Sequence, residues 1–363
     1  MEWFILQKLS ALLSYTLKTH VAEIGLLIFN CSDLSELLAN QLSDKAEVLD
    51  YSRNKFTTLP IISESKECPD KHKCTTTNST YHCRLDISFS RNQISNFTEE
   101  SLRAVSCLRT LDLSFNELTA DAFNANTFQS GVYYLQRLIL NNNPIGRLPG
   151  NVITQPFMPY LRELDLSHCH LEDLSNKRQN QLTYMPENIF GDLVSLKVLL
   201  LSDNKIQGFH EGAFYRYSSL EILDLRNNQL TSVPYTALDK LTKLQSLDLS
   251  QNPIRQVTRG PITSGVQTLA LDNIPDLAEL GPYSLASFTG LVSLSVSGNK
   301  ALQAIHPKFL GDNPATLKHV RLENNKLSTL GSDALPWKQL TGLKLGGNPW
   351  YCDNQLGWMI KAL

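Results

Sequence analysis

A short pattern of leucines recurs along this chain and constrains its fold more than any other feature. Residues 220–234 read LEILDLRNNQLTSVP, with leucines at positions 220, 223, 225 and 230 and an asparagine at position 228. Residues 244–254 repeat the pattern, with Asn252 in the place of Asn228. A pattern L-x-x-L-x-L-x-x-N-x-L that recurs in phase predicts a chain built from stacked copies of one unit.

The asparagine marks each unit. It occurs twelve times if one cysteine and one isoleucine are accepted in its place. Most steps between markers fall within the roughly 20–29 residues of this repeat class, and the steps that end at Asn92 and Asn204 are longer. A further degenerate unit is predicted upstream, because Asn30 precedes Asn54 by one repeat length with Leu27 in phase. The markers are Asn54, Asn92, Asn116, Asn143, Cys169, Asn204, Asn228, Asn252, Ile274, Asn299, Asn325 and Asn348.

The spacing determines how one unit folds. Alternation places Leu223 and Leu225 on the same face of a short strand. One unit cannot bury its leucines alone, so neighbouring units stack and share a continuous core. We therefore predict an α/β solenoid of about twelve leucine-rich repeats, a horseshoe with a parallel concave β-sheet and an irregular convex side. The asparagine is predicted to bond backbone groups where the chain leaves each strand, which is a structural role.

Departures from the repeat define the expected domain limits. Residues 1–45 are predicted to form an N-terminal cap or degenerate first repeat, residues 46–348 the solenoid, and residues 349–363 the start of a truncated or divergent cysteine cap. Inserts near 61–83 and 175–185 are predicted loops, the second being either a binding loop or a tolerated surface loop. Glu2 and Lys8 interrupt the apolar N-terminus, which reads as a degraded signal segment, a cap helix or an incomplete gene model. No run of 18 apolar residues occurs, so no transmembrane helix is predicted.

The cysteines are concentrated near the first insert. Cys83 and Cys107 each precede the first position of their repeat and are one repeat apart. On neighbouring coils they would lie about 5 Å apart, within reach of a disulfide. Cys68 and Cys74 would then close a small loop. The alternatives are a zinc site that uses a histidine at position 72 or 82, and reduced thiols in a cytosolic protein.

Three sequons give modest support for an extracellular route, because they cluster beside these cysteines. They make Asn30, Asn78 and Asn96 the candidate glycosylation sites.

The C-terminal residues carry a family resemblance. The segment Asn348-Pro-Trp-Tyr-Cys352-Asp, followed by Leu356 and Trp358, resembles the opening of the cysteine-rich cap of extracellular leucine-rich repeat proteins. The unit LRTLDLSFNEL at 108–118 resembles the "typical" repeat subclass of Toll-like receptor ectodomains, Slit-type guidance proteins, chaoptin-like adhesion proteins and the acid-labile subunit. The resemblance covers residues 46–358 and implies the fold and an extracellular setting, without selecting a member. Asn354 lies where that family commonly has a second cap cysteine.

One side chain per unit is expected on the concave surface, because the residue between the two strand leucines must point away from the core. Down the stack this row is acidic with apolar interruptions and ends in basic residues. The row is a candidate ligand-binding face, and the alternative is that its aspartates belong to the repeat pattern L-D-L-S itself. The predicted binding residues are Asp112, Ile139, Asp165, Leu200, Asp224, Asp248, Arg321 and Lys344.

Enzyme motifs are absent from the sequence, so no catalytic residue, cofactor or metal is predicted. A formal net charge of -2 argues against bulk attraction to nucleic acid, so no nucleic-acid partner is expected, although some of the Toll-like receptors that the chain resembles bind such ligands. We predict a non-enzymatic recognition module, an extracellular or cell-surface receptor or adhesion ectodomain that binds a protein or glycan ligand through its concave face. Membrane attachment would need a missing segment or a partner, and a homodimer is compatible with the sequence. The alternative is a cytoplasmic leucine-rich repeat scaffold.

Overall fold

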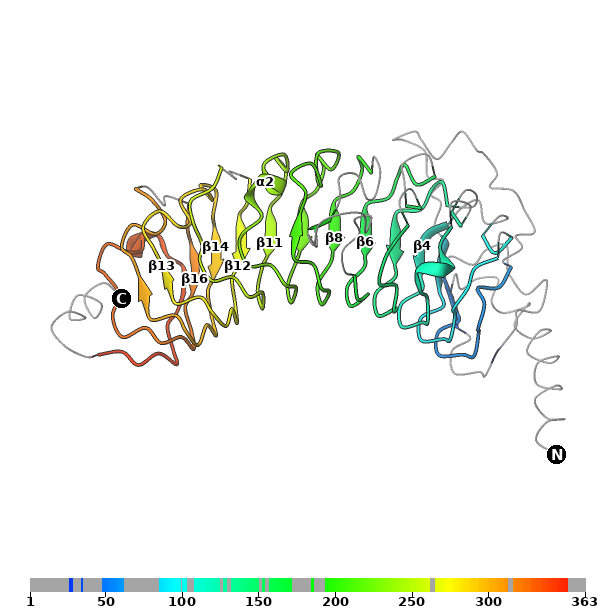
Figure 1. The fold of residues 1–363 in the computed structure, drawn as a ribbon, viewed down its shortest axis with the longest axis horizontal. Helices are drawn as coiled ribbons and strands as arrows, with labels where there is room; N and C mark the ends of the chain where they lie inside the picture. Colours follow the sequence, from blue (N-terminus) through cyan, green and yellow to red (C-terminus); the bar gives the residue numbers. More distant parts are fainter. Residues whose placement is uncertain are drawn as a thin grey trace, which may run out of the picture. The chain divides into compact units, whose positions relative to one another are not determined.

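The computed structural model describes residues 26–28, 34, 48–61, 85–98, 100–102, 108–124, 127–128, 132–149, 152–153, 157–171, 184–185, 193–261, 265–312 and 316–351 (Figure 1). The chain divides into two compact units, Met1–Leu164 (unit 1) and Asp165–Leu363 (unit 2).

Unit 1 is a stack of parallel strands. Each strand pairs with the next in chain order, so every connection returns to the same side before the next strand begins. A short 3-10 helix, η2 (Ala120–Ala122), lies in one return segment. The strands are β1 (Leu26–Ile28), β2 (Val48–Asp50), β3 (Leu85–Ser88), β4 (Leu108–Asp112) and β5 (Arg137–Ile139), and β6 (Glu163–Asp165) spans the division between the units.

Unit 2 repeats the arrangement. Its strands also pair in parallel in chain order. They are β8 (Val198–Leu200), β10 (Ile222–Asp224), β11 (Ser246–Asp248), β12 (Thr268–Ala270), β14 (Ser293–Ser295), β16 (His319–Arg321) and β17 (Gly342–Lys344). The return segments carry the paired short strands β7 (Tyr184–Met185) and β9 (Gly208–Phe209), and β13 (Glu279–Leu280) and β15 (Ala304–Ile305), with α2 (Tyr235–Leu238) and η3 (Trp337–Gln339).

The strands lie at the positions that the leucine pattern predicts. Leu223 pairs with Leu199 on one side and Leu247 on the other, so equivalent leucines stack from coil to coil. Leu220, Leu223 and Leu225 are fully buried. Burial of one leucine side chain contributes roughly 2 kcal/mol to the stability of the folded chain. A single unit cannot bury its leucines, and stacking on neighbouring units provides that burial. The predicted fold class, an α/β leucine-rich repeat solenoid with a parallel sheet and irregular return segments, is confirmed.

The asparagine row has the predicted structural role. The Nδ2 of Asn228 donates to the carbonyl oxygens of Leu225 (3.1 Å) and of Leu201 in the preceding coil (2.9 Å). Its Oδ1 accepts the backbone N–H of Ile206 at 3.0 Å. Each buried amide therefore bonds two successive coils together and satisfies backbone groups that no strand reaches.

The two replacements in this row are accommodated differently. Cys169 and Ile274 are both fully buried. The Oδ1 of Asn204 accepts backbone N–H groups from both Cys169 (3.1 Å) and Leu171 (2.8 Å). The Oδ1 of Asn299 accepts the N–H of Ile274 at 2.6 Å. The asparagine of the next coil thus bonds the backbone at both replaced positions.

The register of the upstream unit requires a correction. A marker at Asn30 would place Leu27 opposite Tyr51, because each precedes its asparagine by the same interval. Strand β1 does pair with β2, but Leu27 is in register with Leu49 instead. The predicted phase was wrong because the apparent repeat period was given more weight than the alignment of the strand leucines.

Several predicted features lie outside the described residues. These are the disulfide candidates Cys68, Cys74, Cys83 and Cys107, the sequon residues Asn30 and Asn78, and most of both inserts. Asn96 is described; it is exposed, and its Oδ1 accepts the N–H of Phe97 at 2.8 Å.

Candidate binding face

The predicted row of outward side chains is arranged in register within each unit. In unit 2, Asp224 lies between Leu200 and Asp248 on neighbouring strands. The row continues through Ala270 and Ser295 to Arg321 and Lys344. In unit 1, Asp112 is in register with Ser88 and Ile139. Asp165, the first residue of unit 2, ends β6.

An apolar patch lies on strands β8 and β10, and it consists of Val198, Leu200 and Ile222. Val198 is in register with Ile222, and both are outward-facing neighbours of the buried strand leucines. Ile222 is 40% exposed and the other two are half-buried. Isoleucine and leucine in outward positions are not needed for the solenoid core, so this patch is available for an apolar contact with another molecule.

The aspartates of the row have a local structural role. One oxygen of Asp224 accepts the backbone N–H of Arg226, and one oxygen of Asp248 accepts that of Ser250, both at 2.9 Å. Asp165 bonds Ser167 in the same way. Each aspartate thus satisfies the N–H two residues further on, which explains why the pattern L-D-L-x recurs. The second carboxylate oxygen is not needed for this turn.

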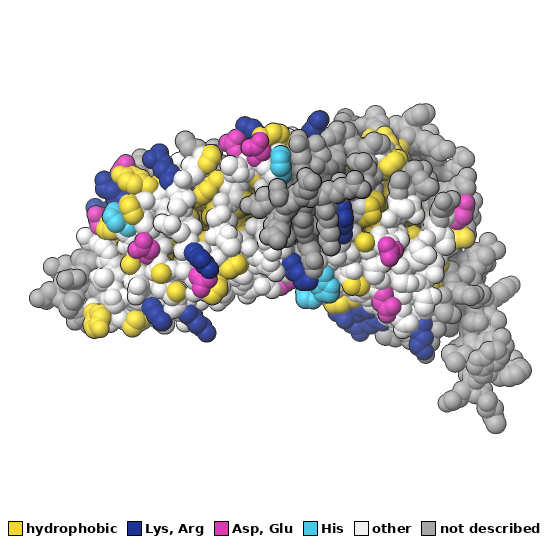
Figure 2. Space-filling view, viewed as in Figure 1, with side chains coloured by type: hydrophobic (Ala, Val, Ile, Leu, Met, Phe, Trp, Pro, Cys, Tyr) yellow, Lys and Arg dark blue, Asp and Glu magenta, His cyan; other side chains and the backbone are white. Residues whose placement is uncertain are grey.

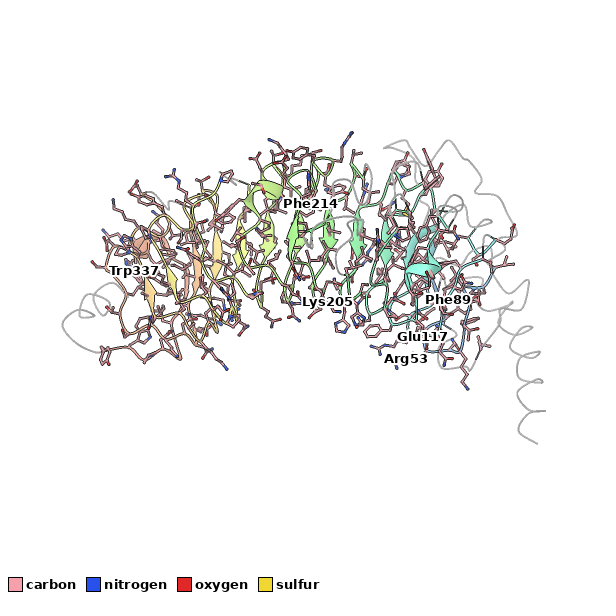
Figure 3. The ribbon with its side chains drawn as sticks, viewed as in Figure 1. Arg53, Phe89, Glu117, Lys205, Phe214 and Trp337 are labelled. Carbon is pink, nitrogen blue, oxygen red and sulfur yellow. The ribbon has the colours of Figure 1, made fainter. Side chains whose placement is uncertain are left out.

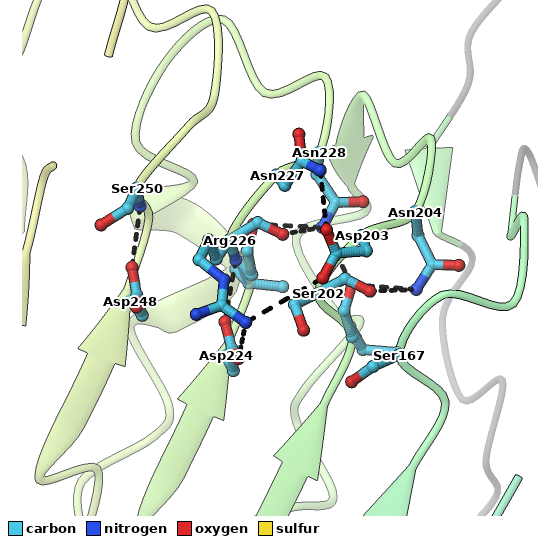
Figure 4. Close-up of polar contacts among 12 residues, drawn as sticks. Ser167, Ser202, Asp203, Asn204, Asp224, Arg226, Asn227, Asn228, Asp248 and Ser250 are labelled. Atoms are coloured by element: carbon cyan, nitrogen blue, oxygen red, sulfur yellow. Dashed lines mark hydrogen bonds and ion pairs between the residues drawn. The ribbon is translucent and has the colours of Figure 1, made fainter. Parts of the chain in front are cut away.

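A polar cluster surrounds Asp224 (Figure 4). The Arg226 guanidinium lies 3.9 Å from carboxylate oxygens of both Asp203 and Asp224. Asn227 Nδ2 donates to Asp203 Oδ1 at 2.7 Å. Burial, and then repulsion from the Asp248 carboxylate, raise the pKa of Asp224 above its ordinary value. The acidic part of the row is therefore a place where added positive charge is favourable.

The far end of the same row is basic. Arg321 and Lys344 are exposed on adjacent strands. Arg321 Nε bonds Glu323 at 3.2 Å. Three strand steps separate Asp248 from Arg321, or about 14 Å at the usual strand spacing. Unit 2 thus presents apolar, acidic and basic side chains in sequence along one row.

Ion pairs between neighbouring coils border the row, and sequence reasoning missed them. Lys197 Nζ lies 2.6 Å from Glu221. In unit 1, Arg109 pairs with Asp86, and Arg137 bonds Glu163 at 2.7 and 3.2 Å. The available signal was opposite charge at strand positions one repeat apart. Such exposed pairs contribute at most about 1 kcal/mol each, so their main effect is to fix the charge pattern of the surface.

A second missed feature follows the strands. The residue before each marker position adopts a left-handed backbone. In unit 1 these residues include Arg53, Arg91 and Phe115, with φ of 57°, 58° and 54°. The Arg91 guanidinium lies 4.1 Å from the centre of the Phe115 ring. Figure 3 shows Arg53 at the same edge as Glu117, away from the buried Phe89. Asparagine and glycine adopt a left-handed backbone more readily than arginine or phenylalanine. Arginine and phenylalanine at these positions place exposed side chains along this edge.

Metal and membrane features are absent from the described part of the chain. No group of three or more histidine, cysteine, aspartate or glutamate side chains among these residues is arranged to hold a metal ion. The histidines within the described residues, at positions 168, 170, 210, 306 and 319, are exposed. No helix in the residues described is both long and apolar enough to cross a membrane.

Comparisons with known proteins identify the repeats. A leucine-rich repeat family model matches residues 178–230 and 194–254, and a second leucine-rich repeat model matches 106–122 and 157–174. The NT-3 growth factor receptors of Gallus gallus and Homo sapiens are each 28% identical over 98 residues, which is 27% of this chain. The match spans only 12% and 11% of those receptors.

Solved structures share the fold. A TLR13–ssRNA13 complex gives a TM-score of 0.63 at 23% identity, covering 86% of this chain and 45% of that chain. The latrophilin 3–Unc5D–FLRT2 complex gives 0.59 at 21% identity, covering 77% and 80%. The leucine-rich repeat domain of APL1B gives 0.52 at 21% identity, covering 73% and 70%. Repeats, register and comparisons together show that the chain contains leucine-rich repeats and has the leucine-rich repeat fold, which is typical of protein–protein interaction.

Proposed function

We propose that this chain is a non-enzymatic recognition module that binds a protein ligand through the outward face of the unit 2 sheet. The observation that carries the proposal is the apolar patch of Val198, Leu200 and Ile222 beside a row that changes from acidic to basic. An apolar contact surrounded by charge of fixed order gives both affinity and orientation.

The chemistry of the face favours a protein over the other ligand classes. Its apolar side chains are aliphatic, whereas sugars are held best by flat aromatic faces. Asp224 and Asp248 oppose a phosphate backbone. The complementary ligand has aliphatic side chains next to lysine or arginine, with acidic residues about 14 Å further along.

We further propose an extracellular or cell-surface setting, in a receptor or adhesion ectodomain. Three similarities support it: the NT-3 growth factor receptor over 98 residues, and the TLR13 and FLRT2 folds. The exposed sequon residue Asn96 is compatible with that route.

The test is a binding screen of the complete secreted chain, multimerised for avidity, against an array of cell-surface and secreted proteins. We expect a ligand whose affinity falls at least tenfold for Ile222→Asp and for Leu200→Glu. Val194→Asp is the matched control, because Val194 is 42% exposed but lies outside the row. A screen without hits, or a ligand that responds equally to Ile222→Asp and Val194→Asp, would reject the proposed face.

A further inference from the structure

Three tyrosines of unit 1 form a partly exposed aromatic cluster that the repeat pattern does not require. Tyr133 meets Tyr134 and Tyr160 edge-to-face, with ring centres 5.1 and 5.7 Å apart. Tyr134 and Tyr160 are stacked, with ring centres 5.8 Å apart. In Figure 2, hydrophobic side chains are visible on the surface of unit 1, together with charged ones.

The tyrosines occupy the one or two positions just before the first leucine of two successive repeats. In most later repeats these positions hold small or polar residues, such as Ser-Ser at 218–219, Thr-Lys at 242–243 and Thr-Gly at 289–290. The fold therefore tolerates serine, threonine or glycine there. It therefore does not require aromatic residues at these positions in two consecutive repeats.

Each tyrosine site is held by a tight turn with buried ends. The N–H of Leu135 donates to the Val132 carbonyl at 3.0 Å, and the N–H of Leu161 donates to the Met158 carbonyl at 3.2 Å. All four of these residues are fully buried. Tyr133, which is 50% exposed, is thus presented on a fixed backbone and supported by two half-buried rings. A pre-ordered aromatic ring loses little entropy on binding.

The charge beside the cluster identifies the partner. Arg162 is exposed two residues after Tyr160, and within the described part of the chain no carboxylate pairs with it. Arg137, also close in the sheet, is more exposed than the Glu163 that it bonds. The surface beside the rings is therefore positive, and tyrosine with arginine is the composition of interface hot spots.

We propose that Tyr133, Tyr134, Tyr160 and Arg162 form a second protein-binding surface, separate from the unit 2 face. Its partner is a protein segment with an apolar side chain, which packs against the Tyr133 ring, next to an acidic side chain that pairs with Arg162. A sugar platform is disfavoured because the stacked pair covers ring faces and Tyr133 meets both neighbours at steep angles of 86° and 78°.

The experiment uses a random peptide library displayed on phage and selected on the complete chain. Counter-selection uses the double variant Tyr133→Ser, Arg162→Glu. We expect enrichment of peptides with an apolar residue near aspartate or glutamate. The affinity of these peptides should fall at least tenfold for the single variants Tyr133→Ser and Arg162→Glu. It should stay within twofold of wild type for Tyr133→Phe. Lysine in place of the acidic peptide residue should restore binding to Arg162→Glu.

Controls separate this surface from general loss of folding and from the unit 2 face. Tyr215→Ser removes another exposed tyrosine, 47% exposed, outside the cluster. It and Ile222→Asp should leave peptide affinity unchanged, and thermal midpoints should match across the variants. Failure to enrich discriminating peptides, or peptides insensitive to Arg162→Glu, overturns the proposal. Binding of a glycan array, or a dimer in sedimentation, that depends on Tyr133 overturns it as well.

Discussion

At the scale of single residues, the most consequential side chains are the buried asparagines. Asn228, for example, joins two coils with its amide, donating to carbonyls of both and accepting one N–H. No apolar residue of similar size supplies both donor and acceptor. The sequence predicted this role because a polar residue recurring inside a leucine framework must have backbone partners.

Asn252→Ala is expected to destabilise the chain by roughly 3 kcal/mol, because it leaves buried polar groups unsatisfied. Asn252 is fully buried, donates to the carbonyls of Leu225 and Leu249 at 2.9 Å, and accepts the N–H of Leu230 at 3.0 Å. Urea unfolding measures the change, and the exposed Gln256→Ala is the control. Equal midpoints for the two variants would contradict the bonding role.

Asp224→Asn is expected to stabilise the chain at pH 7 and to lose this advantage in acid. The folded pKa of Asp224 is raised by burial and then by Asp248, so its ionised form destabilises the folded state. This penalty is absent below the ordinary pKa of 3.8 and develops as pH rises through the raised value. The isosteric amide can still accept the Arg226 N–H.

The measurement for this substitution is the unfolding midpoint from pH 3 to pH 7. The difference in unfolding midpoint between Asp224→Asn and wild type should grow with rising pH. Asp248→Asn should lower the pKa of Asp224, which carboxyl NMR resonances report directly. A difference independent of pH would show that Asp224 is not the group responsible.

At the scale of elements, stability depends on how many neighbours a strand has. β11 lies between β10 and β12, and its Leu247 is fully buried. β17 is the last strand described; it pairs with β16, and its Leu343 is only half-buried. In stacked repeats each coil interacts mainly with its neighbours, so the same substitution has different effects along the chain.

Leu247→Ala should lower the free energy of unfolding by about 2–5 kcal/mol, the range for a buried leucine. Leu343→Ala should lower it clearly less. Chemical unfolding of both variants checks the order. Native-state hydrogen exchange should show slower exchange in β11 than in β17. Equal losses for the two variants would mean that β17 is as well covered as β11.

Strands were also the most predictable elements. The positions of Leu223 and its equivalents determined strand placement and register, because alternation and stacking are properties of the pattern. The tyrosine cluster could not be found in this way. Tyr133 and Tyr160 belong to different repeats and are distant in sequence, and only the turns of two coils show that their rings meet. The hydrogen bond from the Arg226 N–H to the Asp224 carboxylate could not be predicted either, because it depends on the backbone geometry at Arg226.

At the scale of the whole molecule, the setting in which the chain folds decides whether the proposed faces meet their ligands. Asn96 connects sequence and setting, because it is exposed and followed by Phe-Thr. Its backbone is held by an isolated bridge between Thr58 and Asn96. A glycan attached there would project from the surface without displacing core residues.

Expression in a secretory host should therefore yield a chain that is glycosylated at Asn96. Glycosidase treatment followed by mass mapping detects the modified peptide, and Asn96→Gln should abolish it with an unchanged unfolding midpoint. Secreted, folded chain with an unmodified Asn96 peptide would contradict the prediction. Retention as aggregate would instead favour the cytoplasmic scaffold.

The amide bonds between coils have a consequence for how such a chain can change over generations. They span only the strand and its exit, so unequal distances between successive markers leave the outward columns of each unit aligned. Insertions and deletions in the return segments are therefore tolerated without scrambling the order of recognition residues. A lineage can thus vary the length of its loops by insertion and deletion. It can vary the chemistry of its sheet face independently, by point substitution.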